Sequence, residues 1–126
     1  MSLQTAIGKV RGLGSARDGT DHWKMQRLTA LSNLLLVTWL VFSLASLDGT
    51  DYLTVRAWLA SPIAAILMIL LVISVFYHAR LGLQVVVEDY VHHEGARIAS
   101  LAAIQLLTFG LGIACIVAIL MVASGS

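Results

Sequence analysis

Charged residues leave three long gaps in this chain of 126 residues, and apolar residues fill each gap. No Asp, Glu, Lys or Arg lies between Arg27 and Asp48, between Arg56 and Arg80, or after Arg97, which leaves gaps of 20, 23 and 29 residues. An α-helix of about 20 apolar residues, rising about 1.5 Å per residue, crosses the hydrocarbon core of a bilayer. The pattern therefore predicts an all-α integral membrane protein with three transmembrane helices.

The predicted spans cover about residues 23–47, 60–87 and 97–123, and we expect them to form one membrane domain, 23–126. A polar arm, residues 1–22, precedes this domain. The arm is charged and rich in glycine, and it lacks the apolar segment of a cleaved signal peptide. We therefore expect the first span to serve as its own insertion signal.

The link between the first two spans has its own pattern. The sequence DGTD at 48–51 predicts a turn, and the mixed polar and aromatic segment 52–60 is expected to lie along the membrane interface. Ser61 and Pro62 then suit the N-cap and the first turn of the next helix.

Composition supports a membrane protein. Hydrophobic residues make up 59% of the chain and charged residues 12%, and the mean hydropathy is +0.89. A soluble domain carries about 25% charged residues. The formal net charge is only +1, and no nucleic-acid partner is expected. The single cysteine, Cys115, excludes a disulfide within the chain and is expected to be a small packing residue.

Lys and Arg residues are unevenly distributed among the ends of the spans. Arg56 alone lies in the first link, and Arg97 lies in the second. The arm and its junction with the first span hold Lys9, Arg11, Arg17, Lys24 and Arg27. By the positive-inside rule, the N-terminus and the second link are expected in the cytoplasm, or in the matrix of a mitochondrion. The first link and the C-terminus are then expected in the periplasm or intermembrane space.

In the third span, Gly110, Ala114 and Ala118 follow one another at intervals of four residues. Such a stripe of small residues lets another helix approach closely. Because three short helices also enclose little interior, we expect another chain to complete the bundle.

The stretch 77–95, YHARLGLQVVVEDYVHHEG, interrupts the apolar pattern of the second span. On an ideal helix, Gly82 lies about 40° and Asp89 about 20° around the axis from His78. The three residues therefore share one face if the helix continues to Asp89, with about 16 Å along the axis between the imidazole and the carboxylate. Tyr90 would point about 120° away unless the helix ends before it.

His78 lies about two turns inside the span, and an ionisable group at that depth is costly unless it belongs to a site or a network. It is either a packing residue bonded to a neighbouring helix, part of a proton path, or a ligand of a metal or haem. In the haem case the flat macrocycle would rest where Gly82 leaves room, and haem iron commonly takes axial histidine. The other histidines, His22, His92 and His93, lie near the membrane surface. A second axial ligand would therefore come from another polypeptide.

Two arginines are compatible with a haem site. Arg27 lies at the edge of the first span, and Arg80 lies two residues after His78. Arginine pairs well with carboxylates in partly dry surroundings, as with haem propionates. Alternatively, either side chain extends to the phosphate head groups of the bilayer.

The stretches HARLGLQVVVEDY at 78–90 and DHWKMQRLTALSNLLLV at 21–37 resemble a known family. The chain looks like the small cytochrome b membrane-anchor subunit of succinate dehydrogenase (respiratory complex II), the subunit lettered D. The resemblance covers about residues 20–123, and its specificity rests on the spacing of His, Gly, Asp and Tyr in the second span.

The resemblance implies a role for each residue of this pattern. His78 would be one axial ligand of haem b, held in a bundle shared with the larger cytochrome b anchor subunit, with Gly82 making room for the macrocycle. Tyr90 would donate a hydrogen bond to a carbonyl oxygen of ubiquinone, and Asp89 beside it would order the pocket or pass protons. Arg27 would face a haem propionate or the edge of the quinone pocket. The resemblance leaves the role of Arg80 open.

The resemblance also implies partners and a location. The chain has no cysteine set for an iron–sulfur cluster and no flavin motif, so an iron–sulfur subunit and a flavoprotein subunit would deliver electrons from succinate. The segment VHHEG at 91–95 resembles a loop that contacts the iron–sulfur subunit. The complex would lie in a bacterial inner membrane or the mitochondrial inner membrane, and the isolated chain would have no activity. The alternatives are a fumarate reductase anchor that uses menaquinone and a haem-free scaffold or assembly protein.

Overall fold

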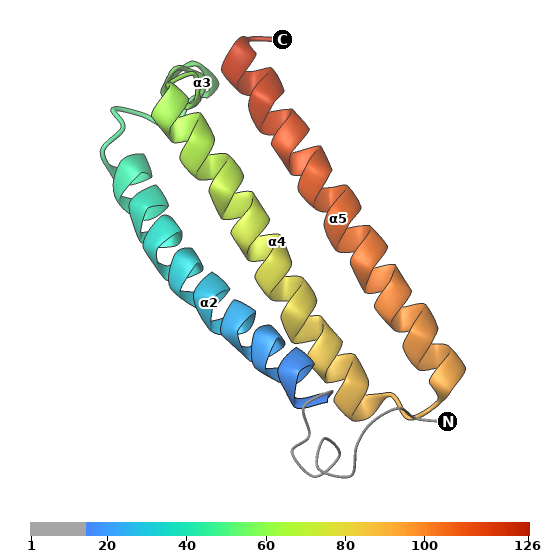
Figure 1. Cartoon of the computed structure of the whole chain (residues 1–126). Coiled ribbons are helices and arrows are strands. Elements are labelled where there is room, and N and C mark those ends of the chain that lie inside the picture. Colours follow the sequence, from blue (N-terminus) through green and yellow to red (C-terminus); the bar gives the residue numbers. More distant parts are fainter. Residues whose placement is uncertain (1–14) are drawn as a thin grey trace.

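The computed structural model describes residues 15–126, and all regular structure in that part of the chain is helical (Figure 1). The helices are α2 (Ser15–Ala45), α3 (Tyr52–Leu59), α4 (Pro62–Tyr90) and α5 (Glu94–Ser124). The prediction of an all-α fold is therefore confirmed. Residues 1–14 of the expected polar arm lie outside the described residues, as do the side chains of Lys9, Arg11 and Arg17.

In the part of the chain that the structure describes, three helices are long and apolar enough to cross a membrane, which confirms the number of predicted spans. The helical segments extend past the predicted spans in several places. Helix α2 begins at Ser15, α4 continues to Tyr90 and α5 begins at Glu94. The difference has a simple cause, because charge gaps mark the part of a helix that lies in hydrocarbon, whereas backbone hydrogen bonds continue until a cap or turn ends them.

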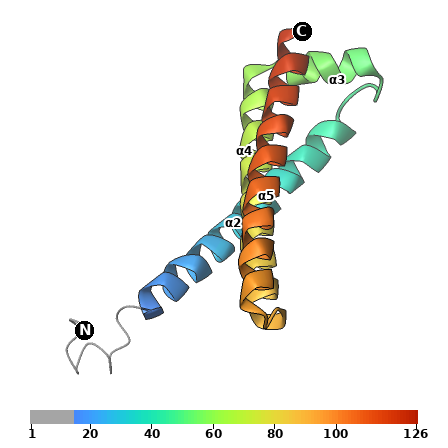
Figure 2. The same ribbon diagram turned by 90° about the vertical axis from the view of Figure 1, so that its right-hand side faces the viewer.

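Helix α4 is the central element. It packs against α2 on one side and α5 on the other, and α2 and α5 do not contact each other in the described residues. Figure 2 shows that α2 crosses α4 at a clear angle, whereas α5 runs alongside α4. The end of α4 near Tyr90 therefore lies at the same end of the molecule as the start of α2.

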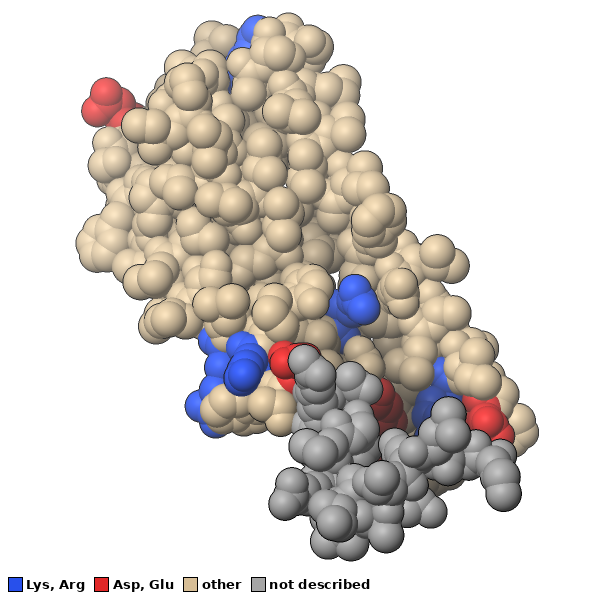
Figure 3. Space-filling view, in the orientation of Figure 1, with Lys and Arg blue, Asp and Glu red and all other residues tan. Residues whose placement is uncertain are grey.

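Charged side chains lie mainly at that same end of the molecule. Figure 3 shows a wide uncharged band above them, and an acidic and a basic side chain at the opposite end. The band corresponds to the charge gaps in the sequence, which are long enough for helices that cross a bilayer core.

The short helix α3 lies across the end of the bundle, beside the end of α5 (Figure 2). Its N-cap is Asp51, whose carboxylate accepts hydrogen bonds from the Thr54 hydroxyl at 2.6 Å and from the Thr54 N–H at 3.2 Å. These hydrogen bonds, the hydroxyl's first, hold the pKa of Asp51 below its ordinary value. Trp58 stacks on Trp39 of α2 with ring centroids 5.7 Å apart. The stacking connects α3 to the first span.

The caps of the long helices follow local chemistry. Ser61 is the N-cap residue of α4 and Pro62 begins that helix, although the serine side chain makes no capping hydrogen bond. His93 is the N-cap of α5, and its Nδ1 accepts a hydrogen bond from the Ala96 N–H at 3.2 Å. At the other end of α5, Gly125 adopts φ +80°, a left-handed conformation that favours glycine.

The interior that these helices enclose is small. Five apolar side chains of the described residues are buried, namely Leu59, Ala64, Leu71, Leu81 and Ile119. Gly112 is also buried, and a Cβ there would touch the Phe76 ring at 3.8 Å. Gly110, by contrast, has nothing within 4 Å of where its Cβ would be. The predicted stripe of small residues is therefore exposed, on a surface that lipid or another chain would cover.

Candidate functional site

His78 forms a hydrogen bond across the α2–α4 interface. Its Nδ1 lies 3.0 Å from the hydroxyl oxygen of Thr29 on α2. Thr29 and Ser74 are the two buried polar residues of the described chain, each 7% exposed. The hydroxyl of Ser74 lies 3.4 Å from the backbone oxygen of Thr29. The imidazole is therefore held on one side by the hydroxyl of Thr29, a buried residue whose backbone Ser74 in turn contacts.

The other ring nitrogen of His78 has a different environment. Nε2 forms no hydrogen bond with any residue that the structure describes, and it is not fully enclosed by the protein. The side chain is only partly buried. One nitrogen is thus engaged inside the chain, while the other is available to a group from outside it.

Thr29 belongs to a polar stripe along α2 that the sequence analysis missed. His22, Gln26, Thr29 and Asn33 follow at intervals of four, three and four residues, within about 60° of one another around the helix. Three of their polar atoms are enclosed without a hydrogen-bond partner in the described residues, namely His22 Nε2, Gln26 Oε1 and Asn33 Oδ1. Their helical spacing was the signal that could have revealed this stripe in the sequence.

Gly82 lies one turn after His78, opposite this stripe. A Cβ placed on Gly82 would lie 3.7 Å from Gln26 Nε2, an ordinary van der Waals distance, with no other atom within 4 Å. Packing against α2 therefore does not require glycine at this position. Space beside the helix remains where a side chain would otherwise stand.

Asp89 and Tyr90 complete α4, and both are exposed, with Tyr90 at 78%. Because the helix continues without a break from His78 to Asp89, the two residues share a face with about 16 Å between them along the axis. Tyr90 is still helical, so its side chain leaves the helix about 100° from that of Asp89. The structure thus places this pair at the charged end of the molecule, apart from the imidazole.

The two arginines lie on aromatic rings. The guanidinium of Arg27 lies 4.6 Å from the centre of the Trp23 ring, and that of Arg80 lies 5.7 Å from the centre of the Tyr77 ring. Both are cation–π contacts within one helix. Arg27 is exposed and lies about 160° around α2 from Thr29, so the structure does not bring it to His78.

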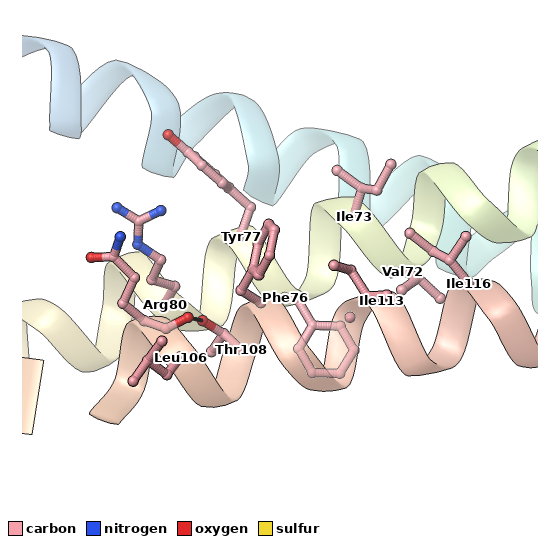
Figure 4. Close-up of a pocket in the computed structure, with 12 residues that line it drawn as sticks. Val72, Ile73, Phe76, Tyr77, Arg80, Leu106, Thr108, Ile113 and Ile116 are labelled. Atoms are coloured by element: carbon pink, nitrogen blue, oxygen red, sulfur yellow. Dashed lines mark hydrogen bonds between the residues drawn. The ribbon is translucent and has the colours of Figure 1, made fainter. Parts of the chain in front are cut away.

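Two open grooves follow α4. The groove between α4 and α5 has a volume of about 410 Å³ and a mainly apolar lining (Figure 4). Phe76 points toward α5, whereas Tyr77 points toward α2 and Arg80 lies at one end. The groove between α2 and α4 has a volume of about 620 Å³ and includes the polar residues Thr29 and Ser74. Both grooves are open and mainly apolar.

No three His, Cys, Asp or Glu side chains of the described residues are placed so that they could hold a metal ion together. His78 is therefore a single nitrogen donor from this chain. If a metal is bound there, its remaining ligands come from a macrocycle or from another polypeptide.

Comparison with known proteins gives one consistent result. A family described as the succinate dehydrogenase/fumarate reductase transmembrane subunit matches residues 1–122. A succinate dehydrogenase hydrophobic membrane anchor subunit from Rickettsia bellii is 35% identical, over 93% of this chain and 94% of its own length. The protein of the same description from Rickettsia conorii is 31% identical over 93% and 94%. A succinate dehydrogenase membrane anchor subunit from Reclinomonas americana is 30% identical over 72% and 78%. No solved structure matches the chain significantly.

Proposed function

Since the chain belongs to the family of succinate dehydrogenase and fumarate reductase transmembrane subunits, we propose that it ligates haem b through His78 and completes the ubiquinone-reduction site of complex II. As a member of this family with three apolar helices, it is a multi-pass membrane protein and an anchor within an enzyme complex.

The observation that carries the haem proposal is the asymmetric environment of the imidazole. Metal-bound histidine almost always donates its second ring N–H to a neighbouring group, and His78 Nδ1 has such a neighbour in Thr29. Nε2 is left as the donor to iron, and Gly82 leaves space beside it for a flat ring. The residues present therefore fit haem b, which would supply one-electron chemistry when bound. A second protein ligand for the haem would come from the larger cytochrome b anchor subunit.

Tyr90 and Asp89 are the residues that we assign to the quinone. Both lie at the end of α4 with their polar groups exposed, where a ring can enter from lipid and protons from water. The Tyr90 hydroxyl would donate a hydrogen bond to a quinone carbonyl as negative charge develops on its oxygen. Asp89 would order the pocket or pass a proton. Because the two side chains diverge around the helix, neighbouring subunits would form the remaining walls.

The remaining assignments follow the charge distribution. The charged end would face the cytoplasm, or the mitochondrial matrix, with the C-terminus in the periplasm or intermembrane space. The iron–sulfur and flavoprotein subunits would dock on that end and deliver electrons from succinate. Arg27 is exposed there and would reach a haem propionate or the edge of the quinone pocket by leaving its ring contact with Trp23.

The haem proposal is tested in the assembled complex by the absorption spectrum of its reduced form. His78→Ala is expected to remove or shift the b-type bands. His92→Ala, which changes an exposed histidine outside the spans, is the matched control and should leave them unchanged. If His78→Ala leaves the bands as they are, His78 is not the ligand. A colourless complex with wild-type subunits would instead support a haem-free scaffold.

The quinone proposal is tested by comparing two activities of the same preparation. Tyr90→Phe is expected to lower succinate–ubiquinone reductase activity by about 10²- to 10³-fold, as for other transition-state hydrogen-bond donors, while succinate oxidation by an artificial dye persists. Tyr52→Phe, an exposed tyrosine at the opposite end, is the control. Equal loss of both activities in Tyr90→Phe would make Tyr90 a structural residue.

A second function is consistent with the family description, which also includes fumarate reductase. In that case the complex would reduce fumarate with electrons from menaquinone. The relatives reported above favour succinate oxidation. Identification of the quinone that copurifies with the complex, together with the rates in the two directions, separates the two functions.

A further inference from the structure

Among the described residues, Thr29 is the side chain that hydrogen-bonds the imidazole of His78, and the other hydrogen bonds of Thr29 indicate which of the two groups donates. The Thr29 hydroxyl has a single proton, and the backbone oxygens of Met25 at 2.8 Å and Gln26 at 3.1 Å are its acceptors within the helix. The hydroxyl oxygen is then left to accept a hydrogen bond from His78 Nδ1 at 3.0 Å. The neutral ring therefore carries its proton on Nδ1, and Nε2 keeps a free lone pair.

We propose that Thr29 is a positioning residue for the haem: it fixes the tautomer and orientation of His78 and tunes the donor strength of Nε2. This inference rests on the proposed haem function. Thr29 is assigned no role in the quinone chemistry, and it does not contact the iron itself.

The surroundings of Thr29 suit this role. Thr29 is only 7% exposed, so little water reaches its hydroxyl to compete for the hydrogen bond. Ser74, which is equally buried and one turn before His78, has its hydroxyl 3.4 Å from the Thr29 backbone oxygen. The two contacts join α2 to α4 at the level of the imidazole. The ring is thus oriented by the packing of two long helices instead of by a mobile loop.

An acceptor on Nδ1–H makes the imidazole a stronger donor, because it withdraws the proton from the ring. A stronger donor stabilises ferric iron relative to ferrous iron, so the hydrogen bond lowers the reduction potential. Loss of such an outer partner typically changes affinity or activity by about 10- to 100-fold. A tenfold loss in the preference for the ferric state corresponds to a rise of about 59 mV for a one-electron couple.

The experiment is a potentiometric titration of the haem in the intact complex, with the low-temperature electron paramagnetic resonance spectrum of its ferric form. Thr29→Val keeps the shape of the side chain and removes the hydroxyl. It is expected to raise the midpoint potential by about 59 mV and to shift the ferric signal. Thr29→Ser restores the hydroxyl and is expected to return both to the wild-type values. Thr38→Val is the matched control, because Thr38 is on the same helix and bonds only its own backbone, at Leu34 O.

The outcomes separate this inference from the haem proposal itself. If His78→Ala removes the haem bands while Thr29→Val leaves potential and ferric signal at wild-type values, the positioning role is wrong and the ligand assignment survives. If His78→Ala has no effect, the haem proposal fails first. If the valine variant does not assemble, Thr29→Ala replaces it. If Thr29→Ser then differs from wild type in midpoint potential and ferric signal as much as Thr29→Ala does, the inference is overturned.

Discussion

Gly82→Ala is expected to be tolerated if only the chain's own packing surrounds Gly82, and to weaken haem binding if a macrocycle lies beside His78. The change adds one methyl group to the face of α4 that carries the imidazole. If no group from outside the chain occupies this space, the added Cβ lies 3.7 Å from Gln26 Nε2, an ordinary van der Waals contact. Alanine should then be tolerated, and it should stabilise the helix by about 1 kcal/mol relative to glycine.

The expected result differs if haem occupies that space. A methyl group forced into a well-packed site costs about 1–3 kcal/mol. At about 1.4 kcal/mol per tenfold change, haem affinity should fall by about 5- to 140-fold. The stability of α4 itself should not fall. Lower haem content in a complex that assembles normally is therefore the expected signature.

The assay is the molar ratio of haem to flavin in purified complex, measured at limiting haem supply. The thermal midpoint of subunit dissociation is measured on the same samples. Gly19→Ala is the matched control, since its Cβ meets nothing within 4 Å and it lies on another helix. Haem content equal to wild type in Gly82→Ala, at every haem supply tested, would contradict the placement of a macrocycle against Gly82.

Three further predictions concern the ends of the helices. Hydrogen bonds from Thr54 lower the pKa of Asp51, so the carboxylate stabilises α3 above its unfolded-state pKa, and this stabilisation is lost as the pH falls through its folded-state pKa. Amide exchange in α3 should therefore speed up in acid beyond the intrinsic effect of pH. Protection factors in α3 that do not change with pH would exclude the effect. Gly125→Ala should destabilise the last turn of α5 by about 1–2 kcal/mol because φ is +80°, measured by amide exchange there; unchanged exchange would refute the strain. His93→Ala should cost the first turn of α5 about 1 kcal/mol through loss of its N-cap, whereas His92→Ala should not, and equal protection in both variants would argue against capping.

Much of the architecture follows from charge spacing, because a charged group in hydrocarbon costs several kcal/mol and is therefore restricted to the ends of a span. The three apolar helices were predictable for that reason. The helical form of the segment before Ser61 was not, because its pattern indicated only a location along the membrane interface. So was the shared face of His78, Gly82 and Asp89, since it needs only an unbroken helix. The ends of the helices were less predictable, because α4 continues to Tyr90 through polar residues that do not break a helix.

The polar stripe on α2 shows the limit of that reasoning. Gln26, Thr29 and Asn33 are uncharged, so the charge pattern passes over them. Threonine, asparagine and glutamine also make packing hydrogen bonds between membrane helices, so their presence does not by itself indicate a functional site. These side chains matter here because they face α4. The sequence alone does not specify which faces of two helices pack together.

The amino-acid sequence by itself determined that this chain crosses a membrane three times and that an imidazole lies within the second helix, because both depend on local periodicity and on the cost of charge in lipid. Only the tertiary structure decided which nitrogen of that imidazole is engaged. The crossing of α2 over α4 brings a threonine 49 positions earlier in the chain to within 3.0 Å of Nδ1. A contact of that kind depends on the angle and register of two packed helices, which no local pattern specifies.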